Sequence, residues 1–576
     1  MSQLCEPAKK MPVEQSRKFM LLLLACGLLV RIGPPATLSI DHFDEGIYAL
    51  AGQWPFQPGG LAKIDPSVIP YGPPVTPVLI GLCSFLMGSP SDFAALLPGI
   101  ICGTSAIWLT RNFCRQLFGD KAALIAATLV AFSGMAIAFS RTALTDTPLA
   151  CFWLLAMITG QKFLEKPGLK NALAMGLCVG LCQLTKYNGA LTGLIIAATA
   201  VLDFGFSVVK KKPDWAAFRQ RIVLGIFGAL IAFLVYLPWL MYVENHGGYR
   251  SLLNHHSGYV KPLASSPSNL KMQLVQAWAF DQFIPLKLLL GIILLLLVIT
   301  FQKQFAVRAK NETQSSPVSL LPNVAPLLIS IILVPNAAWV VSIIRLPGLL
   351  KSDKIGLRLL AVWFATMSII TPVYHPYARL WLPAQMASFC ITALILAELI
   401  ESKRGEKTMK RSIITNFTIY LLSPAIISMA MHEFHFKSNS NLSKNIYAGR
   451  GGLKHQVQAL APEISQALAR GRVEMLVSPA VRWHLMGTLE SGRTRGALAS
   501  LPSLNNWSGQ APLLLDQSLV GEAEISRLGA PIHKRIAAAA GLPPDTQDRG
   551  LITTLDIQPD SPMKATLPHT DLLLVP

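Results

Sequence analysis

Long apolar runs separated by short polar connections dominate the first three quarters of the chain. A helix needs about 20 apolar residues to cross a membrane, and about thirteen runs approach that length. They lie at 19–33, 93–110, 122–140, 147–161, 171–184, 188–204, 222–243, 284–301, 319–334, 337–349, 356–373, 378–399 and 413–431. The pattern predicts an all-α polytopic membrane domain with about thirteen transmembrane helices.

A further apolar segment, residues 73–88, opens with Pro73, Pro74 and Pro77. We expect it to lie along the outer surface or to enter the membrane and return. The lysines and arginines of the connections then fall mostly on one side, which the positive-inside rule assigns to the cytoplasm. This sorting predicts a cytoplasmic N-terminus, an odd number of spans and two long outer loops, 34–92 and 244–283.

The composition changes beyond Met431. Residues from 436 onward are polar, with a helix predicted at Gln456–Arg470 and strands predicted at Arg472–Pro479 and Ala511–Leu515. We therefore predict two domains, a transmembrane domain over 1–434 and a soluble α/β domain over 435–576 on the extracytoplasmic side. No repeat of fixed period is visible, so the inverted-repeat pattern of many transporters is missing.

Composition and charge support a membrane protein. The chain is 52% hydrophobic and only 14% charged, whereas soluble domains average about 25% charged residues. The net charge of +19 is explained by the basic connections, so no nucleic-acid partner is expected. None of the nine cysteines lies beyond Cys390 and no CxxC pair occurs, which argues against a disulfide framework in the C-terminal region and against a cysteine zinc site.

Ionisable side chains gather at the connections assigned to the outer face. A charge at membrane depth costs at least about 2.5–3.5 kcal/mol, so such residues usually have a function. The candidates are Asp41, Asp44, Glu45, Arg141, Asp146, Lys186, His375, Tyr377 and Arg379. Carboxylates and cations on one rim suit a substrate that has a phosphate at the interface and a proton to be removed.

Each candidate also has a structural interpretation. The basic side chains could extend to lipid head groups, and the paired carboxylates of the first loop could be solvated charge. Asp146, followed by Thr-Pro, is a good helix start, and His375 before a proline could hydrogen-bond a turn. The loop histidines, His246, His255 and His256, could help to bind a metal or the acceptor, but solvation is their expected state.

Five short strings, spread in order over about residues 15–400, resemble the motifs of one enzyme superfamily. They are Asp41-His-Phe-Asp44-Glu45, Tyr71-Gly-Pro73-Pro74, Ser140-Arg141 with Thr145-Asp146, Leu184-Thr-Lys186, and His375-Pro-Tyr377-Ala-Arg379. Together they are similar to the GT-C glycosyltransferases. The narrower likeness is to the protein mannosyltransferase-like branch, which includes dolichyl-phosphate-mannose-protein mannosyltransferases and bacterial lipid A aminoarabinose transferases. Many relatives have a lysine before Pro-Pro where this chain has Tyr71-Gly72, so one phosphate contact is absent or comes from Lys63.

The resemblance implies a GT-C fold and transfer of a sugar from a polyprenyl-phosphate carrier, with inversion, at the outer face of the membrane. It implies Asp44 as general base, with Glu45 as orienting partner or alternate base, and Asp146 as a residue that holds a cation or the sugar. Cations would stabilise the departing lipid phosphate. The donor-binding set is Arg141, Lys186, His375, Tyr377 and Arg379.

The scheme requires no cofactor or metal. Oxygen ligation of Mg²⁺ or Mn²⁺ by Asp41, Asp44 and Glu45 remains an alternative. The sugar stays open, as does an acceptor among lipid, protein and glycan. A bacterial plasma (inner) membrane is expected because the resemblance is to bacterial members. The main rival function is a transporter or flippase of a lipid-linked saccharide, which would carry charges within its spans. A ligase or polymerase of lipid-linked saccharides and a sensor with a ligand-binding C-terminal domain are further alternatives.

Overall fold

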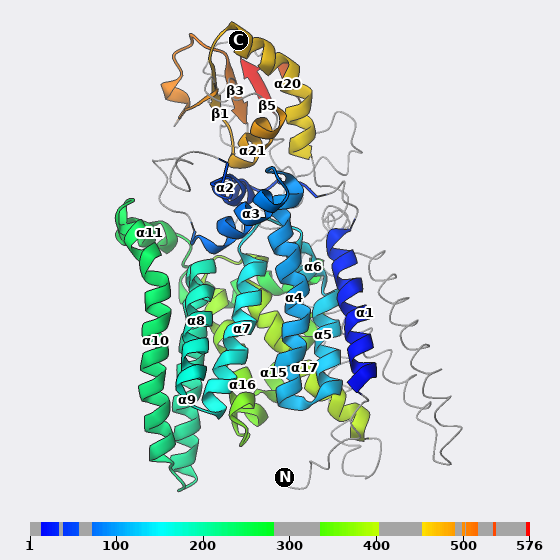
Figure 1. Ribbon diagram of the computed structural model, residues 1–576, viewed down its shortest axis with the longest axis vertical. Coiled ribbons are helices and arrows are strands. Elements are labelled where there is room, and N and C mark those ends of the chain that lie inside the picture. The colour runs from blue at the N-terminus through cyan, green and yellow to red at the C-terminus, as the bar shows by residue number, and fades with distance from the viewer. Residues whose placement is uncertain are drawn as a thin grey trace, which may run out of the picture. The chain divides into compact units, whose positions relative to one another are not determined.

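The computed structural model describes most of the 576-residue chain, namely residues 13–33, 38–56, 72–280, 335–402, 452–489, 498–501, 503–516, 534–536 and 572–575. The chain forms two compact units, each assembled from separate stretches of sequence (Figure 1). The first unit comprises Met1–Arg31, Cys102–Ala138 and Leu149–Lys437, and the second comprises Ile32–Ile101, Phe139–Pro148 and Ser438–Pro576. The domain boundary expected at 434/435 stays a prediction.

The first unit is a bundle of apolar helices. Its members are α1 (Val13–Ile32), α5 (Asp120–Phe132), α8 (Leu169–Thr185), α9 (Leu191–Val209), α10 (Trp215–Glu244), α15 (Pro335–Leu350), α16 (Ile355–Ile370) and α17 (Leu382–Ser402), together with most of α4 (Asp92–Phe118) and α7 (Asp146–Glu165). These helices run alongside one another in Figure 1. α8 and α10 pack so closely that a Cβ on Gly176 would lie 2.3 Å from the Gly228 carbonyl oxygen. Small residues allow such approach between membrane helices.

Within the described residues, six helices are long and apolar enough to cross a membrane. A seventh span results if α5 and α6 (Gly134–Ser140), between which the chain bends by 58°, are counted as one helix. The chain is therefore a multi-pass membrane protein. The runs at 284–301, 319–334 and 413–431 lie outside the described residues, so the total of thirteen stays a prediction.

The second unit contains two short helices that follow the first predicted span. α2 (Phe43–Ala51) packs against α3 (Val75–Leu86), and a Cβ on Gly52 would lie 2.4 Å from Cγ2 of Ile80. The 12 residues of α3 extend about 18 Å, well short of the ~30 Å hydrocarbon core. This length agrees with the expectation that residues 73–88 do not cross the membrane.

The C-terminal part of the second unit contains helices and a mixed sheet. The helices are α20 (Gly452–Arg470) and α21 (Pro479–Thr488), and the strands are β1 (Val473–Leu476), β2 (Leu498–Ser500), β3 (Leu513–Asp516), β4 (Lys534–Ile536) and β5 (Leu572–Val575). The strand order is β2-β1-β3-β5-β4, with β1 parallel to both neighbours and β5 antiparallel to both of its own. α20, β1 and β3 lie where the sequence predicts a helix and two strands. A separate soluble α/β domain over 435–576 stays a prediction.

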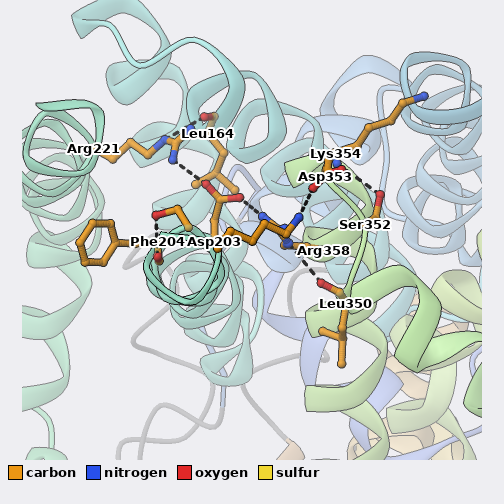
Figure 2. A network of polar contacts seen from close by, with 11 residues as sticks. Leu164, Asp203, Phe204, Arg221, Leu350, Ser352, Asp353, Lys354 and Arg358 are labelled. Atoms are coloured by element: carbon orange, nitrogen blue, oxygen red, sulfur yellow. Dashed lines mark hydrogen bonds and ion pairs between the residues drawn. The ribbon is translucent and has the colours of Figure 1, made fainter. Parts of the chain in front are cut away.

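A network of ion pairs joins several helices of the first unit (Figure 2). Asp203 of α9 pairs with Arg221 of α10 at 2.8 Å and also with Arg358 of α16. The two guanidinium groups continue the network by donating to the Leu164 and Leu350 carbonyl oxygens. One carboxylate therefore links two arginines, one of which, Arg358, has a side chain only 5% exposed.

We expect Asp203→Asn to destabilise the detergent-solubilised protein, by about 3 kcal/mol, because removing one partner of a buried pair leaves the other charge uncompensated. The midpoint of thermal unfolding measures this effect. The matched control is Glu398→Gln, which breaks an exposed pair with Arg345 outside this network. Equal midpoints for the two variants would contradict this assignment of the network.

Candidate functional site

The first predicted motif, Asp41 to Glu45, forms the capped beginning of α2. The His42 imidazole accepts a hydrogen bond at Nδ1 from the Asp44 amide, at 3.1 Å. The Glu45 carboxylate returns to the start of the helix, where its Oε2 accepts from the His42 amide at 2.9 Å and the Asp41 amide at 3.1 Å. This reciprocal capping box places Asp44 and Glu45 on the first turn of α2.

Glu45 also joins the first loop to the second predicted turn. Its other oxygen, Oε1, accepts a hydrogen bond from the Ala143 amide at 3.0 Å, and the residue has no exposed surface. One carboxylate thus satisfies three backbone donors from two segments that are far apart in the sequence. Both of its oxygens are engaged with the backbone, which suits an orienting residue.

Asp44 differs from its neighbour. It is 7% exposed, so its side chain is shielded from bulk solvent but retains some accessible surface. The Asp44 amide is held by His42, and the turn beneath it is held by Glu45. The loop therefore holds the Asp44 carboxylate on a fixed backbone. A carboxylate that was only solvated charge would not need such fixation.

The second turn, from Arg141 to Asp146, lies wholly in the interior. Arg141 has no exposed surface, and its Nη1 donates to the Ile32 carbonyl oxygen at 2.7 Å. It therefore does not extend toward water or head groups. Asp146 is 2% exposed and is the first residue of α7, as expected for a helix start. The second unit thus contains five of the nine candidates, Asp41, Asp44, Glu45, Arg141 and Asp146.

Gly33 is required for the position of Arg141. Its φ is +53°, and a Cβ on Gly33 would lie 2.2 Å from Nη1 of Arg141. We expect Gly33→Ala to displace the guanidinium and to lower the level of folded protein in membranes. The control is Gly88→Ala, where φ is +78° but no atom lies within 4 Å of the added Cβ. Both variants carry the strain of a left-handed alanine, about 1–2 kcal/mol, so any further loss in Gly33→Ala reports the contact with Arg141.

The other four predicted residues lie in the first unit, beside a group of aromatic rings. Lys186 separates α8 from the 3₁₀ helix η3 (Tyr187–Ala190). The Tyr187 ring contacts His256 of α11 (Gly248–Ser257) edge to face, at 5.6 Å between ring centroids. His256 Nδ1 in turn lies 3.3 Å from the Tyr374 hydroxyl. These contacts connect the Lys186 turn with the late turn that carries His375.

The backbone strengthens this connection. Val260 and Tyr374 form an antiparallel bridge, and the His375 amide donates to the Tyr259 carbonyl oxygen at 2.8 Å. In the same turn the Tyr377 ring packs against His375, and the Arg379 guanidinium lies 4.8 Å from the centre of the Tyr377 ring. The late turn therefore offers imidazole, phenol and guanidinium groups close together, paired with the 244–283 loop.

The structure also shows residues that the sequence analysis did not select. His256 was expected to be a solvated loop histidine, but it is partly buried between two tyrosines. His42 and the Ala143 amide were not considered, and only tyrosines in the outer connections hinted at the aromatic group. Lys63 and Tyr71 lie outside the described residues. Throughout the part of the chain that the structure describes, no group of three or more His, Cys, Asp or Glu side chains is arranged to hold a metal ion.

Two comparisons with known proteins bear on this geometry. The family described as dolichyl-phosphate-mannose-protein mannosyltransferase matches residues 71–242. The fold is similar to the crystal structure of ArnT from Cupriavidus metallidurans bound to undecaprenyl phosphate, with a TM-score of 0.52 and 13% sequence identity, over 91% of this chain and 96% of that chain.

A second similar structure is the oligosaccharyltransferase of Archaeoglobus fulgidus in its apo form. Its TM-score is 0.50 at 14% identity, over 82% of this chain and 64% of that chain. None of the curated proteins matches the sequence. The family match and the shared fold confirm the predicted resemblance to the GT-C glycosyltransferases.

Proposed function

We propose that the protein is a membrane glycosyltransferase that moves a sugar from a polyprenyl-phosphate carrier to an acceptor hydroxyl. The oxygen of the acceptor attacks the anomeric carbon, and the bond from that carbon to the phosphate oxygen breaks with inversion. The lipid phosphate leaves with the bonding electrons, and the acceptor proton passes to a carboxylate. The reaction takes place at the outer face of a plasma membrane. The N-terminus lies on the opposite, cytoplasmic side.

The geometry of Asp44 is the observation that carries this proposal. A hydroxyl is a poor nucleophile near neutral pH and reacts faster with a positioned base. Asp44 is a nearly buried carboxylate on a capped helix turn, and the adjacent carboxylate, Glu45, binds backbone amides with both oxygens. We therefore assign the base to Asp44 and the orientation of the loop to Glu45.

The cationic and aromatic residues suit the leaving group. Charge that develops on a departing phosphate is stabilised by preorganised donors, and guanidinium groups are well matched to phosphate oxygens. We assign this role to Lys186 and Arg379, with hydrogen bonds from His375 and Tyr377. Arg141 was expected to join them, but it has no exposed surface and donates to the Ile32 carbonyl oxygen, so it would act only through its charge. Asp146, at the start of α7, would hold a cation or a sugar hydroxyl. The similar fold of ArnT, whose crystal structure contains bound undecaprenyl phosphate, supports a polyprenyl-phosphate carrier.

The proposal is tested by sugar transfer in membranes that contain the protein or its Asp44→Asn variant. Labelled mannose, pentose and amino-sugar derivatives of polyprenyl phosphate are offered as donors, and lipid, protein and glycan fractions are examined for label. We expect one donor to give labelled product and free lipid phosphate, and the variant at equal protein level to give neither. The anomeric configuration of the product, determined by NMR, should be opposite to that of the donor.

The same experiment separates the transferase from a transporter. Movement of an intact labelled donor across the bilayer without lipid phosphate release would favour a flippase. Release that is unchanged by Asp44→Asn would remove this carboxylate from the chemistry.

A further inference from the structure

The C-terminal helix α21 lies directly on the helix that carries the proposed base (Figure 1). Gly46, on the first turns of α2, has no side chain at the contact. A Cβ there would lie 2.2 Å from the Ala480 amide nitrogen and 2.3 Å from the Pro479 carbonyl carbon. The two helices therefore meet backbone to backbone immediately beside Asp44 and Glu45, and only glycine fits at this position.

Polar contacts secure the same arrangement. His484 of α21 is 4% exposed, and its Nε2 lies 2.7 Å from the Ile40 carbonyl oxygen, just ahead of the α2 cap. Asp92, at the start of α4, accepts a hydrogen bond from Trp483 Nε1 at 2.7 Å and pairs with Lys454 of α20 at 3.0 Å. The second ring nitrogen of His484 lies 3.9 Å from the same Asp92 carboxylate.

The shortness of α2 gives these contacts their importance. A helix of nine residues is not stable alone, since isolated helices shorter than about 12–15 residues are marginal in water. Its capping box fixes the first turn, but the direction of the helix depends on what packs against it. Its partners are α3, which follows it closely in sequence, and α21, which is separated from α2 by more than four hundred residues of chain.

We propose that residues 452–489 form a positioning element that holds the Asp44 loop in its catalytic conformation. His484 within this element and Asp92 of α4, which anchors the element, are the positioning residues. This inference rests on the proposed function of Asp44. The C-terminal segment touches the backbone of the loop rather than the reacting atoms. Its loss should therefore lower kcat while the KM for the donor changes little.

The helix contact is tested by Gly46→Ala against Gly487→Ala. The alanine at 46 must push α21 away, whereas nothing lies within 4 Å of a Cβ at Gly487, on α21 itself. We expect Gly46→Ala to lower kcat by about 10²-fold, the effect of roughly a 1 Å misplacement at an active site. It should also speed amide hydrogen exchange over residues 38–51. Gly487→Ala should change neither quantity.

The hydrogen bond to Ile40 is tested by His484→Leu against His484→Gln. Glutamine keeps an N–H donor near the position of Nε2, and leucine does not. We expect the leucine variant to behave as Gly46→Ala does, and the glutamine variant to regain most of kcat and of the exchange protection. A role in stability alone would give similar losses in both variants and faster exchange across the whole C-terminal segment.

The two readouts separate this inference from the proposed function. Unchanged exchange over residues 38–51 in Gly46→Ala and His484→Leu would overturn the positioning element, and so would faster exchange with an unchanged kcat. Another outcome is that the unmodified protein transfers none of the sugars while Gly46→Ala and His484→Leu both speed exchange over residues 38–51. In that case α21 does hold the Asp44 loop, and the glycosyltransferase proposal is wrong.

Discussion

Asp44→Asn is expected to lower the kcat of sugar transfer by about 10²–10⁴-fold, the usual contribution of a positioned general base. Asparagine preserves the size of the side chain and leaves the backbone contact to His42 in place. Donor binding and the thermal unfolding midpoint should therefore remain close to those of the unmodified protein. Single-turnover assays with the donor identified in the panel measure the chemical step directly.

The control for Asp44 is Asp41→Asn, a change of the same chemistry three residues earlier. Asp41 contributes to the cap through its backbone amide, which donates a hydrogen bond to Glu45. The substitution therefore keeps that contact. We expect Asp41→Asn to retain most of the activity. Equal losses in the two variants would mean that negative charge on the loop matters, and that no single carboxylate is the base.

Glu45→Ala is expected to damage the fold itself. The substitution removes the acceptor of three amides, those of Asp41, His42 and Ala143, in a site with no exposed surface. Each unsatisfied buried donor costs about 1–3 kcal/mol, so the loss should be at least about 3 kcal/mol. Chemical denaturation in detergent measures the stability, and activity should fall with the amount of folded protein.

Glu45→Gln distinguishes a structural from a chemical role. The amide keeps one carbonyl oxygen as acceptor and turns an N–H₂ group toward the remaining donors, so we expect a stability between those of the alanine variant and the unmodified protein. Full stability with no residual transfer would assign Glu45 to the chemistry, as the alternate base that the resemblance allowed.

Much of the helical architecture followed from local sequence. The apolar runs at 93–110, 147–161 and 222–243 correspond to α4, α7 and α10, because a run of about 20 apolar residues can bury its backbone in a bilayer only as a helix. The expectation that residues 73–88 do not form a full span agrees with the 12-residue length of α3. The bend of 58° between α5 and α6 was not foreseen, although Ser133 and Gly134, which stand at the break, are a pair typical of helix kinks.

The candidate residues were predictable only in part. Asp44 and Arg141 were recognisable because ionisable groups next to apolar spans are costly and rarely without function. The interaction between their turns was not, because Glu45 and Ala143 are 98 residues apart. His256 was misinterpreted for the same reason, as its tyrosine partners come from other segments.

The sequence by itself determined which segments are apolar helices, where a helix is capped and which side chains have the chemistry of an acid, base or phosphate ligand. These properties depend on the identity of neighbouring residues and on the solubility of each segment in lipid. Only the tertiary structure decided that Glu45 binds two segments of backbone, that Arg141 is buried against Gly33, and that α21 holds α2. Such contacts join residues up to 444 positions apart, as between Ile40 and His484. They depend on shape and backbone geometry, which are established only when the whole chain has packed.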